Sequence, residues 1–152
     1  MPKHEKFMKE ALKEARKAFV LDEVPVGAVA AIDDKIIVRA HNRRETLKDP
    51  TAHAEIRCIQ KAAKKLGSWR LSGVTIYSTL EPCAMCAGAM IHARIKELVY
   101  GADDPKAGAC GSVIDITKEG LFNHKLKIVG GVLEGECGEI LKRFFKELRS
   151  KK

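Results

Sequence analysis

Two short stretches decide how this sequence folds and what it can bind: Asp49-Pro50-Thr51-Ala52-His53-Ala54-Glu55 and Glu81-Pro82-Cys83-Ala84-Met85-Cys86. Between them they supply one imidazole, from His53, and two thiols, from Cys83 and Cys86. One histidine and two cysteines make a tetrahedral zinc site with its fourth position left open, which is typical of a catalytic zinc. Glu55 follows close behind the histidine and can carry the proton of a zinc-bound water. The pattern predicts one catalytic Zn²⁺ per subunit, with Glu55 as the catalytic acid and base.

The spacing of these residues also constrains the local backbone. Cys83 and Cys86 are three residues apart, so on a helix they lie on one side, about 60° apart. His53 and Glu55 would diverge by about 200° on a regular helix, so both can face one metal only at an irregular first turn. We expect Thr51 to cap this helix and to place His53 at its start. The expected site is a pair of helix N-termini converging on one zinc, where the helix ends also favour thiolates.

The rest of the chain alternates between helical and extended patterns after an opening hairpin. We predict helices at 3–21, 52–66, 83–92 and 136–151, strands at 24–32, 35–40, 73–78, 97–101 and 125–129, and a loop at 102–111. This order indicates an α/β fold in which helices cover both faces of a five-stranded mixed sheet, a three-layer α/β/α sandwich. Since no repeat or Pro/Gly-rich linker interrupts the pattern, residues 1–152 are expected to form a single domain.

The composition restricts the kinds of partner and compartment. Lys and Arg number 28 against 20 Asp and Glu, a net charge of +8, which favours a polyanionic partner. The same excess of surface charge also occurs in heat-adapted proteins. Five unevenly spaced cysteines fit metal ligands or free thiols in a reducing compartment. With no apolar run long enough for a membrane span and no signal-peptide core at the start, a cytoplasmic protein without membrane attachment is expected.

The two opening stretches together resemble a known signature. His-x-Glu followed by Pro-Cys-x-x-Cys is similar to the motif of zinc-dependent nucleobase deaminases. Flanking segments resemble bacterial tRNA-specific adenosine deaminases over about residues 7–145: EVPVGAV at 23–29, HNR at 41–43, LEPCAMCAGAMIHARI at 80–95, and 108–115. The resemblance implies a cytidine-deaminase-like fold, a homodimer, and conversion of the wobble adenosine of a tRNA anticodon stem-loop to inosine.

The resemblance also implies that Asn42, Asp104 and Lys106 contact the substrate. We further expect Ala54, Phe145 and Arg149 to contact it. Some have simpler explanations, since Asn42 follows a strand and could be only a turn residue, and Asp104 and Lys106 could be solvated loop charges. The predicted last helix carries basic residues beside Phe144 and Phe145, which suits unstacked bases and phosphates. Neighbouring helical residues diverge by about 100°, so we expect one ring in the core and Phe145 nearer the RNA.

Other functions stay open for the same motif. A deaminase of a free base or nucleoside, such as a guanine or cytosine compound, carries a close variant of it, although the positive charge and basic last helix argue against this reading. A zinc-stabilised RNA-binding module would leave Glu55 without a role and would need a fourth ligand from the protein. A redox Cys-x-x-Cys pair would leave His53 unexplained. Cys58 is expected to be a small core residue.

Overall fold

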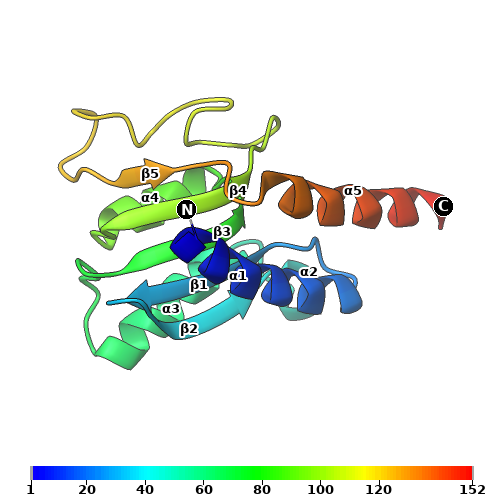
Figure 1. The fold of residues 1–152 in the computed structure, drawn as a ribbon, viewed down its shortest axis with the longest axis horizontal. Coiled ribbons are helices and arrows are strands. Elements are labelled where there is room, and N and C mark those ends of the chain that lie inside the picture. Colours follow the sequence, from blue (N-terminus) through cyan, green and yellow to red (C-terminus); the bar gives the residue numbers. More distant parts are fainter. Residues whose placement is uncertain (1, 152) are drawn as a thin grey trace.

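The alternating pattern forms a sheet with helices on both sides in the computed structural model, which describes residues 2–151 (Figure 1). The elements, in chain order, are α1 (Pro2–Val20), β1 (Gly27–Ile32), β2 (Lys35–His41), α2 (Arg44–Leu47), α3 (Ala54–Leu66), β3 (Thr75–Leu80), α4 (Ala84–His92), β4 (Glu97–Ala102), β5 (Lys127–Val129) and α5 (Glu134–Ser150). Within these residues, no helix is both long enough and apolar enough to span a membrane.

The strands form one mixed sheet in the order β2-β1-β3-β4-β5, which confirms the predicted five-stranded sheet. β1 is antiparallel to β2 and β3, whereas β3, β4 and β5 are parallel to one another. Parallel neighbours need a crossover connection, and α4 supplies it between β3 and β4. The carboxyl ends of β2, β3 and β4 and the amino end of β1 therefore share one edge of the sheet, where open α/β sheets bind their ligands.

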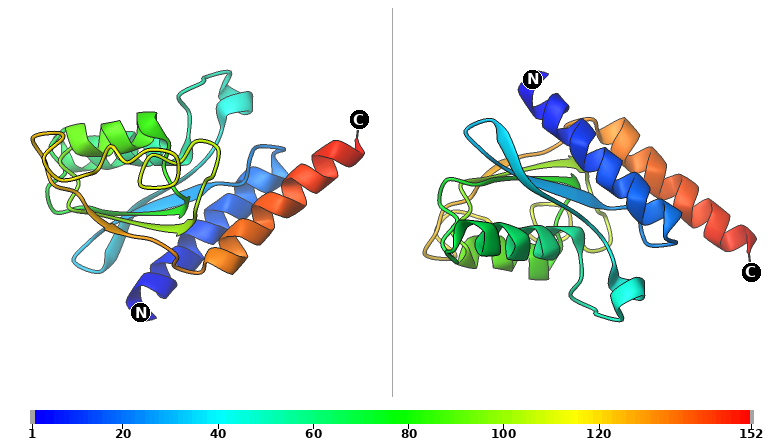
Figure 2. Two further views of the ribbon diagram at one scale, coloured as in Figure 1. Left: turned by 90° about the horizontal axis from the view of Figure 1, so that it is seen from above. Right: turned by 90° about the horizontal axis from the view of Figure 1, so that it is seen from below.

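Helices cover both faces of the sheet, as predicted. Figure 2 shows α3 and α4 on one face and α1 with α5 on the other. Side chains alternate along each strand, so Ala28, Ile76 and Leu98 pack in the core with α3 and α4. Their neighbours Val29 and Tyr77 pack in the second core with α1 and α5. The arrangement is the three-layer α/β/α sandwich expected from the sequence.

The start of α3 differs from the prediction in one respect. Thr51 does not cap the helix, because its hydroxyl donates to Asp49 Oδ1 at 2.7 Å and its backbone N–H donates to the same oxygen at 2.8 Å. The Asp49-Pro50-Thr51 segment is therefore a closed turn of its own. The helix begins at Ala54 rather than at residue 52, and His53 occupies the N-cap position.

Other boundaries also shift. The first strand begins at Gly27 rather than at 24, because the N–H of Val26 donates to the carbonyl of Val24 in a tight turn. The third strand runs two residues later than predicted, since Val74 is held by a turn to Leu71. The fifth strand is shorter and α5 begins at Glu134. The four-residue helix α2 was not predicted.

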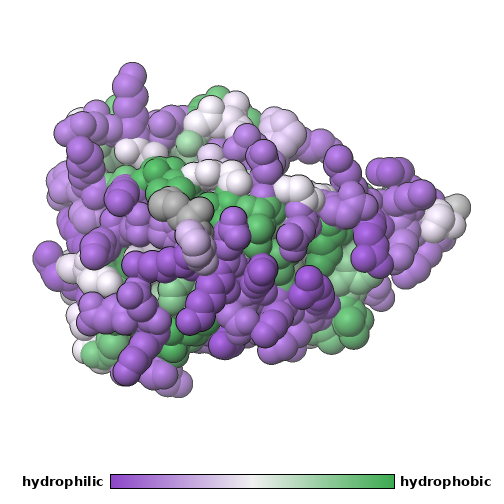
Figure 3. All heavy atoms as spheres, in the orientation of Figure 1, coloured by the Kyte–Doolittle hydropathy of each residue, from purple (hydrophilic) through white to green (hydrophobic). Residues whose placement is uncertain are grey.

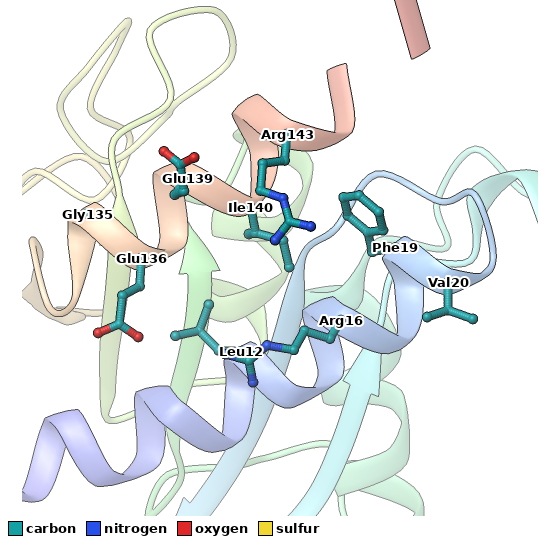
Figure 4. Close-up of a pocket in the computed structure, with 9 residues that line it drawn as sticks. All are labelled: Leu12, Arg16, Phe19, Val20, Gly135, Glu136, Glu139, Ile140 and Arg143. Carbon is teal, nitrogen blue, oxygen red and sulfur yellow. The ribbon is translucent and has the colours of Figure 1, made fainter. Parts of the chain in front are cut away.

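The first and last helices of the chain lie side by side. A groove of about 610 Å³ runs between them and is lined by Leu12, Arg16, Phe19, Val20, Gly135, Glu136, Glu139, Ile140 and Arg143 (Figure 4). The guanidinium of Arg143 lies 5.6 Å from the centre of the Phe19 ring, and Phe144 meets that ring edge-on. The face that carries α1 is mostly hydrophilic, with apolar side chains visible between the charged ones (Figure 3). These contacts tie α5 to α1.

Gly27 lets β1 approach α1 closely, which gives a prediction for stability. A Cβ at this position would overlap the backbone oxygen of Ala11 and the backbone nitrogen of Ala15. Because neither backbone atom can rotate away, Gly27→Ala should lower the free energy of unfolding by about 1–3 kcal/mol or more. The matched control is Gly73→Ala, whose added Cβ meets nothing within 4 Å. Urea unfolding of both variants measures the effect, and equal stabilities would contradict the close approach.

Candidate active site

Two helix N-termini meet at the shared edge of the sheet. His53 is the N-cap of α3, with φ −70° and ψ 152°, and Cys83 is the N-cap of α4, with φ −75° and ψ 177°. Both residues are thus in extended conformation just outside their helices, while Cys86 lies in the first turn of α4. This confirms the prediction that His53 stands at the very start of its helix. The helix starts bring together side chains that are far apart in the sequence.

The three donor atoms have the spacing of a metal site. Nδ1 of His53 lies 3.7 Å from Sγ of Cys83 and 3.5 Å from Sγ of Cys86. Tetrahedral zinc with ordinary Zn–S and Zn–N bonds places such atoms about 3.5 Å apart. All donor atoms of the cluster lie within 4.8 Å of one another, and no fourth His, Cys, Asp or Glu joins them in the part of the chain that the structure describes. The cluster could therefore hold a metal ion by three protein ligands.

The two thiols of the cluster differ in acidity because they are hydrogen-bonded to each other. A hydrogen bond from the Cys86 thiol lowers the pKa of Cys83 to about 4, although partial burial opposes the shift. The same bond raises the pKa of Cys86, since that thiol is the donor. The pair thus shares one proton that a metal ion would displace. Cys58, by contrast, is fully buried in α3, and burial raises its pKa, as expected for an inert core thiol.

Glu55 lies beside the cluster as the second residue of α3. Its side chain is only 4% exposed, and this burial raises the pKa of its carboxyl to about 7. It borders a pocket of about 300 Å³. The full lining is Val24, Val26, Asn42, Arg44, His53, Ala54, Glu55, Leu80, Glu81, Cys83, Asp104, Ala107 and Phe145. A carboxyl that is neither fully protonated nor fully ionised near neutral pH can both accept and donate a proton.

Two of the predicted substrate residues lie in this pocket near the cluster. Asn42 is 6% exposed; its amide donates to the carbonyl of Val24 at 3.1 Å and its oxygen accepts from the N–H of Arg44 at 3.2 Å. The second bond spans two residues, as expected if Asn42 is a turn residue. Asn42 therefore both stabilises the turn and lines the pocket. Ala54 is fully buried and contributes to the wall beside the cluster.

The other predicted substrate residues lie farther out. Asp104 and Phe145 border the pocket, and they also border a second pocket of about 550 Å³ that Lys106 and Arg149 line. The two pockets are therefore adjacent and share part of their lining. Phe145 is 40% exposed whereas Phe144 is 8% exposed, which confirms the expected division between the two rings. Asp104 Oδ1 accepts from the N–H groups of Lys106 and Ala107, so this carboxylate also organises its own loop.

Sequence reasoning did not single out two buried carboxylates near the pocket, Glu23 and Glu81, each 1% exposed. Glu23 accepts from the N–H groups of Glu45 and Thr46 at 3.0 and 2.6 Å. Glu81 accepts from the loop that follows β4. Burial alone would raise both pKa values, but the accepted hydrogen bonds outweigh it and lower the pKa of each group. A single glutamate beside a strand carries no spacing signal by which it could have been found.

The fold and the His–Cys–Cys cluster define a deaminase with the cytidine-deaminase-like fold. The model of the MafB19-like deaminase family matches residues 2–149. A tRNA-specific adenosine deaminase of Bacillus subtilis is 53% identical over 152 residues, covering 100% of this chain and 94% of its own. A solved structure from work on A-to-I editing by tRNA deaminases at the wobble position of transfer RNA is 48% identical with a TM-score of 0.86, over 90% of this chain and 99% of that one.

A guanine deaminase structure from Bacillus subtilis is also similar, with 41% identity and a TM-score of 0.63 over 66% of this chain and 64% of that one. The full-length match with the first relative is higher in both identity and coverage. The chain belongs to the family of tRNA-specific adenosine deaminases.

Proposed function

We propose that this protein hydrolytically deaminates the wobble adenosine of a tRNA anticodon loop to inosine, with one zinc ion per subunit. The observation that carries the proposal is that two pockets lie next to each other and share part of their lining. The inner one is lined by Glu55, His53 and Cys83, and the outer one by three basic side chains and Phe145 together with Asp103, Asp104 and apolar residues. An inner pocket of about 300 Å³ suits a single base, and the outer one suits the strand that supplies it.

The metal in this proposal is zinc, held by His53, Cys83 and Cys86. The atom spacing, the softness of the thiolates and the absence of a fourth protein ligand among the described residues all suit a three-ligand catalytic zinc. Zinc bound there supplies a Lewis acid that makes water nucleophilic at neutral pH. The three side chains would hold the metal next to Glu55, which lines the same pocket as His53 and Cys83.

Glu55 moves the protons in this proposal. Its carboxyl, with a pKa raised by burial, would accept a proton from the attacking water and deliver it to the ring nitrogen of adenine. It would then take the second water proton from the new hydroxyl group on the amino-bearing carbon and pass it to the amino group, so that the C–N bond breaks, ammonia leaves and a carbonyl remains. Because the carboxyl is 4% exposed, bulk water does not compete for the proton. Asn42 and Ala54 would hold the base in the orientation that this transfer requires.

The outer pocket would hold the nucleotides around the target base. Phe145 offers a ring on which an unstacked base can lie, and Lys106 and Arg149 offer cations for its phosphates. Asp104 would accept a hydrogen bond from a neighbouring base. The net charge of +8 supports association with the tRNA at long range.

A free base or nucleoside is the second candidate substrate, and the likeness to a guanine deaminase favours it. Such a substrate would use only the inner pocket and would leave the basic outer pocket without a ligand. The position of the outer pocket directly beside the inner one therefore favours the RNA. We further propose that residues 1–152 form one deaminase domain and act in the cytoplasm, where tRNA is available.

A homodimer belongs to the same proposal. The segment between β4 and β5 exposes four apolar side chains by half or more: Val113, Ile114, Leu121 and Phe122. Apolar side chains gathered on one segment are typical of a surface that a partner subunit covers.

The substrate is tested with an anticodon stem-loop bearing a wobble adenosine, compared with free adenosine, cytidine and guanine. We expect inosine in the stem-loop and no deamination of the free compounds, because only the RNA fills both pockets. Product analysis by liquid chromatography measures this, and turnover of a free compound alone would support the second candidate. As controls, Glu55→Gln should keep its zinc but lose nearly all turnover, and Cys86→Ser should lose both.

The outer pocket gives a second prediction, about affinity. Phe145→Ala and Arg149→Ala should each weaken stem-loop binding by roughly one to two orders of magnitude, from lost stacking and a lost phosphate contact. Filter binding at two salt concentrations measures both effects, and only the arginine variant should lower the salt dependence. Point variants are preferable to removal of the helix end, because Phe144 is buried against Phe19. Wild-type affinity in both variants would remove the outer pocket from the proposal.

The proposed dimer predicts a particle with twice the mass of one chain. Sedimentation equilibrium measures this mass. Phe122→Lys should shift the equilibrium toward the monomer, because an ammonium cannot be buried in an apolar interface without a partner charge. A wild-type chain that stays monomeric at micromolar concentration would contradict the dimer.

A further inference from the structure

Glu81 occupies a position that ordinary folding rules leave unexplained. It follows the last residue of β3 and immediately precedes Pro82 and the metal-cluster residue Cys83. Its side chain is 1% exposed, and no cation pairs with its carboxylate among the described residues. Burying a carboxylate costs free energy unless its oxygens are fully hydrogen-bonded. The groups that satisfy Glu81 therefore indicate what it does.

All of the hydrogen bonds to this carboxylate come from the loop after β4. Oε1 accepts from the N–H of Asp104 at 3.0 Å and from the hydroxyl of Ser112. Oε2 accepts from the N–H groups of Cys110 and Ser112 at 3.0 and 3.1 Å. One side chain thus holds residues 104, 110 and 112 at the same time. The loop is wrapped around the carboxylate rather than merely touching it.

At Gly108 the loop packs closely against the carboxylate of Glu81. A Cβ at this position would overlap the carboxylate of Glu81, so a larger residue would displace either the loop or the carboxylate from the other. Two backbone bonds hold the same turn: Gly108 donates to the carbonyl of Asp104, and Ala109 donates to the carbonyl of Pro82, both at 2.9 Å. The loop is therefore anchored to the segment that carries Cys83.

The same loop forms one wall of both pockets. Asp104 borders the inner and the outer pocket, and Lys106 lines the outer one. We propose that Glu81 is a positioning residue for the deamination reaction: its buried carboxylate fixes loop 103–112 against the metal-cluster segment, so that Asp104 and Lys106 are already placed when the RNA arrives. This inference rests on the proposed function. A preformed wall favours binding, because no free energy is then lost in ordering the loop when the RNA binds.

The first test uses Glu81→Gln and Ser112→Ala. The glutamine keeps the shape but turns an amide N–H₂ toward N–H donors, whereas the alanine removes one donor only. We expect KM for the stem-loop to rise roughly tenfold or more in Glu81→Gln and less in Ser112→Ala, with kcat within about threefold and zinc content unchanged. The matched control is Ser78→Ala, a fully buried hydroxyl of β3 that donates to the carbonyl of Leu80 and does not touch the loop. It should leave KM unchanged.

A double-mutant cycle separates positioning from general stabilisation. Lys106→Ala should raise KM in the wild-type background and add little in the Glu81→Gln background, because the lysine is no longer held in place. Fully additive effects, or an unchanged KM in folded Glu81→Gln, would overturn the inference, and so would a fall in kcat that follows loss of zinc. If Glu81→Gln does not fold, the same cycle is measured with Ser112→Ala in its place. Non-additive effects of Ser112→Ala and Lys106→Ala on KM then support the inference, and fully additive effects overturn it.

Hydrogen exchange keeps the inference separate from the proposed function. The amides of residues 104, 110 and 112 should exchange faster in Glu81→Gln while those of β3 and β4 stay protected. If wild-type protein makes no inosine, the proposed function fails, and the exchange pattern still shows whether Glu81 orders the loop. Unchanged exchange at these amides would refute the inference even in an active enzyme.

Discussion

Parallel pairing of β3 with β4 is the constraint on which the site depends. Two parallel neighbours deliver the chain to the same edge of the sheet, and Leu80 pairs in register with Ala102 at the ends of these strands. The N–H of Glu81 then donates to the carbonyl of Ala102 at 2.8 Å, which extends the pairing past the strands. Cys83 lies two residues after Glu81 in the chain, and Asp104 lies two residues after Ala102. Backbone hydrogen bonds therefore set the distance between the metal cluster and the loop that lines both pockets.

The sequence contains enough information to predict the cluster but less to predict its surroundings. The divergence of His53 and Glu55 on a regular helix requires the histidine to stand at the helix start, and this holds. The prediction that Thr51 caps the helix was wrong because Asp49, two residues earlier, accepts the hydrogen bond of the Thr51 hydroxyl. Such a competition depends on backbone angles that a residue pattern does not contain. The layers of the sandwich were predictable because period-two and helical patterns are long, whereas the four-residue α2 is too short to show one.

Three carboxylates near the site are buried, those of Glu23, Glu55 and Glu81, whereas the outer pocket is lined by both acidic and basic residues. Glu23 accepts from backbone N–H groups of α2, and Glu81 accepts from those of the loop after β4. These two carboxylates thus hold backbone segments in place. The protein as a whole still carries a net charge of +8, which favours a polyanion.

The pairing of α1 with α5 has a consequence for how the protein is made. The outer pocket combines Val24, from just after the first helix, with Phe145 and Arg149, from the last. A nascent chain emerges from its N-terminus, so the sheet and the metal cluster can form while α5 is still within the ribosome. Such a chain has the cluster and the loop after β4 but lacks the α5 side of the outer pocket. We therefore expect the metal cluster to be complete before the outer pocket is.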